Sequence, residues 1–120
     1  MGGKRYPFDL VLSKAAVGTT DDLVTDPVPD GRLYCIQHVV CEDETTYATE
    51  LRLYKSEPER DFLIAEQDHL SAAVAYTYDE PFYLSPRQWL KARFTGATAS
   101  DVLKVTLSGW WQTTPGLGEV

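Results

Sequence analysis

Long hydrophobic runs, an excess of basic residues and clusters of cysteine or histidine are all missing from this sequence of 120 residues. No apolar run approaches the ~20 residues that a membrane-spanning helix needs, and no long apolar stretch follows Lys4 and Arg5. We therefore expect neither a membrane contact nor a secretory signal peptide. Acidic side chains outnumber basic ones by 18 to 11, which gives a formal net charge of −7. Such a chain repels nucleic-acid phosphates, and we expect no nucleic-acid partner.

Only two cysteines, Cys35 and Cys41, are present. On one extended strand they would lie about 20 Å apart, too far for a disulfide. A single C-x5-C pair also lacks the second pair of ligands that a zinc site needs. We predict two buried free thiols, no cofactor, and assembly in a reducing cytoplasm.

Catalytic and metal-binding motifs are missing as well. The nucleophile elbow, the zinc-protease helix, the phosphate-binding loop and the dinucleotide fingerprint are all absent. His38 falls among apolar residues, which favours a core or interface histidine, and His69 is interpreted as a loop residue. The acidic cluster Glu42–Glu44 lacks the spacing of a calcium loop. The sequence thus predicts a protein with no catalytic residues and no metal ligands, and so not an enzyme.

What the sequence does contain is alternation of apolar and polar residues with a period of two, the pattern of β-strands. Trp89–Thr95 and Val102–Ser108 alternate most cleanly, and we expect Thr95–Asp101 to join them as a hairpin-like loop. Proline- and glycine-containing turns such as Asp26–Gly31 and Glu57–Arg60 recur about every ten residues. This spacing predicts a mainly β protein, an antiparallel β-sandwich of jelly-roll type.

The segment Arg32–Glu42 is largely apolar on both faces, which is typical of a central strand. A single alternation through it places Cys35 and Val39 on one face and Ile36 and His38 on the other.

The domain organisation follows from where this regularity begins and ends. Residues 1–30 are interpreted as an irregular N-terminal arm with strand alternation at 6–14, and we expect the arm to be mobile in isolated subunits. Residues 31–111 form the sandwich and 112–120 a tail. Within the sandwich range, residues 61–76 show helical spacing, but two strands, Phe62–Gln67 and Ala73–Tyr78, are favoured over a short helix.

Aromatic and basic residues of the C-terminal half predict an interface between chains. Trp89 shares the outward face of its strand with charged residues, and Trp110 and Trp111 cannot both point inward. One of the pair should be exposed or covered by a partner. The candidate interface residues are Tyr76, Tyr78, Trp89, Lys91, Arg93, Trp110 and Trp111. We expect the basic members to meet the acidic region 42–68 of a neighbouring copy.

The aromatic residues also permit a second interpretation, a carbohydrate-binding sandwich that stacks sugars on exposed rings. Tyr76, Tyr78, Phe82 and Tyr83 lie within eight positions. Alternatively, these rings fill the core of the sandwich.

The run Pro81–Gly109 resembles small β-sandwich structural proteins of tailed bacteriophages. Those proteins show an ending of the form Y-L…G-D-x-L-x-A-x-F-x-G-A-x-x-G-D-x-L-x-V…G after an earlier P-x-G-x-x-Y-x-I-x-x-V strand, which Pro29–Val39 resembles. The chain departs from the pattern where Arg87 and Gln88 replace Gly-Asp and where Ser100 replaces a glycine.

This resemblance implies a structural role in a virion that is assembled in the host cytoplasm. Capsid decoration, in which the chain would stabilise the head by contacts with the major capsid protein, is the first expectation. A head–tail or tail component is the alternative. The implied partners are other virion subunits and further copies of the chain itself.

Overall fold

The computed structural model describes residues 4–68 and 75–114 of the chain. Over these residues the backbone forms nine strands in two antiparallel sheets. In the long sheet the order is β1-β9-β3, with β6 and β7 both paired to β3, and in the short sheet it is β2-β8-β4-β5. The strands are β1 (Arg5–Ala15), β2 (Thr20–Val24), β3 (Arg32–Asp43), β4 (Glu50–Glu57), β5 (Arg60–Asp68), β6 (Tyr76–Tyr78), β7 (Phe82–Leu84), β8 (Trp89–Thr95) and β9 (Val102–Thr113).

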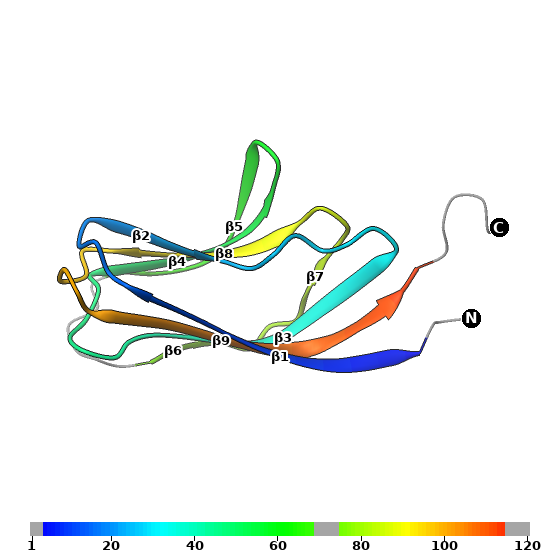
Figure 1. Cartoon of the computed structure of the whole chain (residues 1–120), viewed down its shortest axis with the longest axis horizontal. Helices are drawn as coiled ribbons and strands as arrows, with labels where there is room; N and C mark the ends of the chain where they lie inside the picture. The colour runs from blue at the N-terminus through cyan, green and yellow to red at the C-terminus, as the bar shows by residue number, and fades with distance from the viewer. Residues whose placement is uncertain (1–3, 69–74, 115–120) are drawn as a thin grey trace.

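The two sheets pack face to face as a β-sandwich, which confirms the predicted fold class (Figure 1). The strand orders match, so that β1 and β2, β9 and β8, β3 and β4, and β6 and β5 hold equivalent positions, as in a jelly roll. The hairpin expected at Thr95–Asp101 is wrong, because this loop crosses from β8 in the short sheet to β9 in the long sheet. Alternation identifies a strand without showing which sheet it joins.

Apolar side chains from both sheets fill the space between them. The strands with the cleanest alternation, β8 and β9, bury the residues that were expected to point inward. Each buried leucine contributes about 2 kcal/mol of hydrophobic stabilisation. The residues of the central strands that form this apolar core are Ile36, Val39, Cys41, Leu51, Leu53, Leu90, Ala92, Phe94, Leu103, Val105 and Leu107.

The N-terminal segment belongs to the sandwich. β1 pairs with β9 over all 11 of its residues and β2 pairs with β8 over all 5. The strand alternation expected at 6–14 is therefore correct. The irregular arm expected over residues 1–30 is wrong, because this range contains two strands of the sandwich. Both are edge strands, and none of the side chains of β1 is fully buried.

The limits of the domain change accordingly. The expected range of 31–111 is too narrow, because β1 and β2 precede it and β9 continues to Thr113. The first residues of the tail expected at 112–120 belong to β9. Residues 115–120 lie outside the described part of the chain.

A β-bulge at Gln37 interrupts β3. The pairing of β3 with β9 skips this residue, so that Ile36 before the bulge and Val39 after it both face the core. The single alternation expected through Arg32–Glu42 is therefore wrong. His38 lies on the outer face with its side chain 46% exposed, so it is no core histidine.

Gly109 allows β9 to approach β3 closely beside this bulge. A Cβ atom at Gly109 would overlap with the carbonyl oxygen of Cys35. Glycine is the residue that accommodates such a close backbone approach within a strand.

In the segment 61–76, where helical spacing competed with strand alternation, the described residues 61–68 and Tyr76 lie in strands. The predicted strand Phe62–Gln67 is confirmed as part of β5, and Tyr76–Tyr78 is confirmed as β6. The start of the second predicted strand, at Ala73, lies outside the described residues. In the described part of the chain, no helix has the length and apolar character needed to cross a bilayer.

The two ends of the sandwich differ (Figure 1). At the closed end, the β1–β2, β3–β4 and β8–β9 loops pass from one sheet to the other. At the open end, β1, β3 and β9 extend past the short sheet, so that the start of β1 and the end of β9 lie on this side. The β4–β5 hairpin bends away from the long sheet, with its turn at the expected position after Glu57.

Candidate interaction surfaces and an inter-sheet cavity

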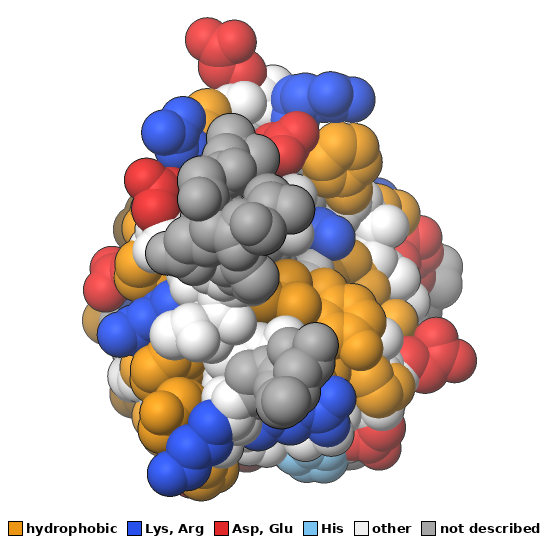
Figure 2. Space-filling model, turned by 90° about the vertical axis from the view of Figure 1, so that its right-hand side faces the viewer, with side chains coloured by type: hydrophobic (Ala, Val, Ile, Leu, Met, Phe, Trp, Pro, Cys, Tyr) orange, Lys and Arg blue, Asp and Glu red, His pale blue; other side chains and the backbone are white. Residues whose placement is uncertain are grey.

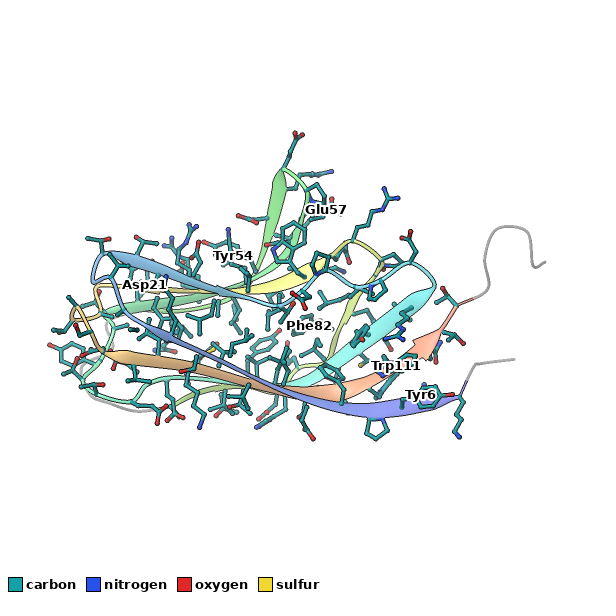
Figure 3. All side chains as sticks on the ribbon, in the orientation of Figure 1. Tyr6, Asp21, Tyr54, Glu57, Phe82 and Trp111 are labelled. Carbon is teal, nitrogen blue, oxygen red and sulfur yellow. The ribbon has the colours of Figure 1, made fainter. Side chains whose placement is uncertain are left out.

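The outer face of the short sheet carries charged side chains gathered around Tyr54 (Figure 3). The Arg93 guanidinium donates two hydrogen bonds to the Asp22 carboxylate, at 2.8 and 3.1 Å. The Lys91 ammonium lies 2.7 Å from Asp61 Oδ2. Lys91 and Arg93 also lie over the Tyr54 ring, 5.2 and 5.6 Å from its centroid. We call these five residues the Tyr54 cluster.

The Tyr54 cluster contains two residues of the predicted interface, Lys91 and Arg93. We expected their charges to meet region 42–68 of a neighbour, but Lys91 pairs with Asp61 in that region of its own chain. The hydrogen bond from Lys91, followed by that from Ser56, lowers the pKa of Asp61. The Lys91 side chain is only 14% exposed. These charges form ion pairs within the fold, and an electrostatic contact between copies stays a prediction.

Trp89 borders the same cluster at the start of β8. It lies opposite Ser56 on the outer face of the short sheet and is partly buried. The Ser56 hydroxyl donates a hydrogen bond to Asp61 at 2.6 Å, which joins the two strands of the β4–β5 hairpin. A role for Trp89 between chains stays a prediction.

Trp111 is covered within its own chain at the open end (Figure 3). Its ring stacks with Tyr6 at a centroid separation of 4.5 Å and with Tyr34 at 6.2 Å, with interplanar angles of 25° and 26°. The Arg32 guanidinium lies 4.0 Å from the Trp111 ring centroid. We call Tyr6, Trp111, Tyr34 and Arg32 the Trp111 stack.

Trp110 points to the opposite face of β9, as alternation requires. Arg5 lies 3.9 Å from its ring centroid, and Tyr83 meets it edge-on at 6.2 Å. Cys35 is buried in the same cross-strand row, where burial raises the pKa of its thiol. Burial also raises the pKa of Cys41 to about 12. Both cysteines are free and buried, as predicted.

Tyr76 and Tyr78 pack against the core. In the register of β6 with β3, Tyr76 lies opposite Cys41 and Tyr78 opposite Val39, both of which face inward. Burial is the main cause that raises the pKa of each phenol. Both rings are partly buried against the core, as in the alternative in which they help to fill the sandwich, and a role for them at an interface or with a glycan stays a prediction.

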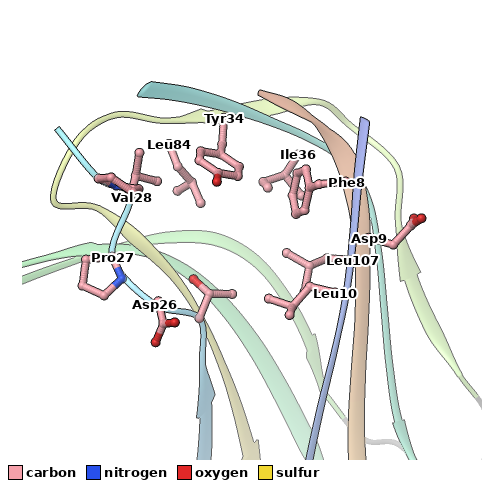
Figure 4. Close-up of a pocket in the computed structure, with 12 residues that line it drawn as sticks. Phe8, Asp9, Leu10, Asp26, Pro27, Val28, Tyr34, Ile36, Leu84 and Leu107 are labelled. Atoms are coloured by element: carbon pink, nitrogen blue, oxygen red, sulfur yellow. The ribbon is translucent and has the colours of Figure 1, made fainter. Parts of the chain in front are cut away.

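The open end contains an inter-sheet cavity of about 290 Å³ between the long sheet and the segment that joins β2 to β3 (Figure 4). Its volume is near the lower limit for small-molecule sites. Among its polar residues, Asp9 turns its carboxylate away from the cavity. Tyr34 belongs both to the cavity wall and to the Trp111 stack. Its hydroxyl accepts a hydrogen bond from Arg32 at 3.4 Å. The apolar wall residues are Phe8, Leu10, Pro27, Val28, Pro29, Tyr34, Ile36, Leu84 and Leu107.

Sequence reasoning missed this cavity, because part of its wall comes from residues that were assigned to the arm. Val28 was the available signal. It is an apolar residue between Pro27 and Pro29, and it is buried although it lies outside any strand. Such a residue indicates a loop that packs onto a core.

Hydrophobic and basic side chains adjoin each other on the surface of the open end (Figure 2). The cations that stack on rings there are Lys4, Arg5 and Arg32, which lie over Tyr6, Trp110 and Trp111 respectively. These pairs leave the faces of both tryptophans partly covered.

His38 belongs to a row of polar residues on the outer face of the long sheet. Its Nδ1 is hydrogen-bonded to Asp79, and Ser108 lies opposite it on β9. The order of carboxylate, imidazole and hydroxyl matches that of serine hydrolases. No hydrogen bond joins His38 to Ser108 in the described residues, and neither lines the cavity. His69 lies outside the described residues.

No protein-family model and no curated protein matches the chain. Among solved structures, it is similar to the K3 cleaved adhesin domain of Lys-gingipain from Porphyromonas gingivalis, with 14% identity, a TM-score of 0.45 and coverage of 75% of this chain and 60% of that one. It is also similar to the Drosophila NLP core, with 16% identity, a TM-score of 0.40 and coverage of 88% and 97%. It is similar as well to an exo-β-1,3-galactanase from Phanerochaete chrysosporium, with 13% identity, a TM-score of 0.39 and coverage of 88% of this chain and 27% of that one. These likenesses concern the β-sandwich architecture alone.

Proposed function

We propose that this chain is a structural subunit that works through protein–protein contacts and catalyses no reaction. The observation that carries the proposal is where its exposed apolar side chains lie. Most of the large ones among the described residues are on strands at sheet edges. They are Tyr6, Leu10 and Val11 on β1, Val24 on β2, Phe62 and Leu63 on β5, and Tyr83 on β7.

Edge strands with exposed apolar residues favour association, because they also present unpaired backbone N–H and C=O groups. β1 and β5 are the long edge strands, and Val11 and Leu63 are each 56% exposed. Pro7 removes one backbone donor near the start of β1, which directs strand addition to the rest of that edge.

Within this proposal the assembly is a tailed-phage virion, and the chain acts first as a capsid decoration protein and alternatively in the head–tail region or tail. The location rests on the sequence resemblance over Pro29–Val39 and Pro81–Gly109. A rigid sandwich suits a subunit that bridges neighbours, since it loses little conformational entropy on binding. Genes for capsid, portal or tail proteins beside the coding sequence would support the location, and a neighbourhood without virion genes would contradict it.

The edge contacts are tested by Val11→Lys and Leu63→Lys, with Val17→Lys as the matched control. Val17 is 67% exposed but lies in the β1–β2 loop. We expect the parent and the control to form oligomers, and at least one edge variant to weaken association about tenfold or more. Size-exclusion chromatography with light scattering measures this. A parent that stays monomeric and binds no virion particles contradicts the proposal.

Glycan binding is the second candidate, and Tyr83 carries it. Its ring is 50% exposed and meets Trp110 edge-on, so that a ring face remains available for a sugar. Trp110 and Trp111 are less suitable, because Arg5 and Arg32 cover them. A glycan array compares the parent with Tyr83→Ala. Retention that is lost in the variant supports this candidate, and a parent that retains no glycan contradicts it.

A further inference from the structure

The segment that joins β2 to β3 forms a fixed wall of the cavity at the open end. Its Val28 N–H donates to the carbonyl of Gln88, and the Arg87 N–H donates to the Val28 carbonyl, both at 2.9 Å. At the start of the segment, the Thr25 N–H donates to the Leu90 carbonyl at 3.0 Å. Because these bonds hold the wall in place, the cavity exists before any ligand arrives, as is usual for small-molecule sites.

The volume and the rings of the cavity determine what can fill it. The volume is about 290 Å³. An apolar cavity of about 150 Å³ takes up benzene, so this one has room for a benzene ring with a short side arm. Two rings of its wall, Phe8 and Tyr34, meet edge to face with their centroids 5.1 Å apart. Aromatic rings favour edge-to-face and offset contacts, which these two rings offer to a third.

The part of the wall that Tyr34 forms is polar. Tyr34 directs its hydroxyl into the cavity, and this hydroxyl accepts a hydrogen bond from Arg32 at 3.4 Å (Figure 4). A hydroxyl that accepts one hydrogen bond keeps its own hydrogen to donate, and a guanidinium has further N–H donors. Stacking of the guanidinium on Trp111, 4.0 Å from the ring centroid, holds it in place. Hydrogen-bond donors thus gather at one side of an apolar cavity.

The charge at this side of the cavity is positive. Over residues 4–68 and 75–114, Arg32 forms no ion pair with a carboxylate. Of the two acidic residues at the cavity, Asp9 turns its carboxylate away and Asp26 is exposed. A guanidinium binds a carboxylate through parallel charge-assisted hydrogen bonds. The charge therefore suits an anionic group on the ligand.

We propose that the cavity at the open end binds a small aromatic carboxylate. The ring of the ligand lies against Phe8 and Val28, and its carboxylate accepts hydrogen bonds from Arg32 and the Tyr34 hydroxyl. Burial of the ring supplies most of the affinity, and Arg32 selects an anion over a neutral molecule. This site goes beyond the proposed contacts at the edge strands, because it takes a small molecule between the two sheets.

The test titrates the full chain with 3-phenylpropionate at neutral pH and constant ionic strength, and follows the backbone amides by NMR. We expect saturable shifts that are confined to the cavity wall, with a Kd of about 1 mM or lower. The neutral 3-phenylpropionamide has the same ring and should bind about tenfold more weakly.

Two variants separate the charge from the shape of the cavity. Arg32→Gln should weaken binding of the carboxylate about tenfold and leave binding of the amide unchanged. Arg87→Gln is the matched control, because its side chain is 78% exposed, and it should keep the affinity of the parent for both ligands.

Two results would overturn the proposal. One is a parent that shows no saturable shifts, or shifts that lie mainly outside the cavity wall. The other is an amide that binds the parent as tightly as the carboxylate, because Arg32 would then select no anion. If Arg32→Gln fails to fold, Tyr34→Phe decides, since it keeps the ring and removes only the hydroxyl. A lower affinity of this variant for the carboxylate supports the site, and an unchanged affinity contradicts it.

Discussion

The closed end and the open end of this sandwich are held by different kinds of contact. At the closed end the contacts are directional and polar. The backbone N–H of Ala16 donates to the carbonyl of Asp101 at 2.7 Å. The buried Asp21 carboxylate accepts the N–H groups of Val17 and Gly18 at 2.8 and 3.2 Å. The first bond joins the β1–β2 segment to the residue before β9, and the other two tie the β1–β2 loop to the start of β2.

At the open end the long sheet extends beyond its partner, and stacked rings take the place of a facing sheet. Tyr6, Trp111 and Tyr34 come from three neighbouring strands, and Arg32 lies over the central ring. Ring and cation stacking depends less on exact direction than hydrogen bonding does. Backbone hydrogen bonds also join loops there, such as the bond from the Arg87 N–H to the Val28 carbonyl at 2.9 Å. The comparison teaches that ring stacking is added where the long sheet has no facing sheet, and substitutions should affect the two ends differently.

The largest effect is expected at Gly109, where the open end joins the body of the sandwich. A methyl group there overlaps with the backbone of Cys35. Gly109→Ala should therefore lower the free energy of unfolding by about 3 kcal/mol. Urea unfolding followed by tryptophan fluorescence measures it. Gly31→Ala is the control, since its φ of 84° is strained but nothing lies near its added Cβ. Equal losses in the two variants would show that close packing is not the cause.

An intermediate effect is expected at the closed end from Asp21→Asn. Burial opposes ionisation of Asp21, but the N–H of Val17, the Lys14 side chain and the N–H of Gly18 outweigh it and lower its pKa. The ionised carboxylate therefore stabilises the fold above its unfolded pKa of about 3.9, and this stability is lost as the pH falls through the folded value.

The substitution should cost about 2 kcal/mol at neutral pH. Urea unfolding at neutral pH and below about pH 4 should show a smaller pH dependence in the variant than in the parent. An identical dependence in both proteins would mean that Asp21 does not supply it.

The smallest effect is expected at the open end from Arg32→Gln, which removes the cation over Trp111. We expect a loss of about 1 kcal/mol and a change in tryptophan emission. Arg87→Gln is the matched control, because Arg87 is 78% exposed and its contact with Asp30, at 3.7 Å, is long. If the two variants lose the same free energy of unfolding and show the same tryptophan emission, the contact of Arg32 with Trp111 adds no stability beyond that of an exposed surface arginine.

Alternation predicted the interior of the sandwich well and its connections poorly. Leu90 and Leu103 are buried as expected, because a strand with one buried face must alternate. The crossing of the β8–β9 loop and the bulge at Gln37 depend on which strands pair in the folded protein. Strand pairing produces no periodic pattern of apolar residues, so the sequence does not predict these two features. β1 was assigned to an arm because an edge strand buries little.

The candidate surfaces were predictable only in part, for a similar reason. Lys91 and Arg93 lie on the outer face, as their positions in β8 predict. Their partners Asp22 and Asp61 come from β2 and β5, and only the strand order brings these four residues together. Residues that are far apart in the sequence become neighbours through the strand order. The alternation in a single sequence does not reveal that order.

The central position of β9 has a consequence for synthesis of the protein. β1 pairs with β9 and β2 with β8, so the first two strands have no partner in their sheets until the ribosome has released the last two. Only local units such as the β4–β5 hairpin can form earlier. Folding is thus a late event that depends on contacts between distant residues, and such folding is slow. Any partner that recognises the edge of β1 as part of a sheet meets a fully synthesised sandwich, never a growing chain.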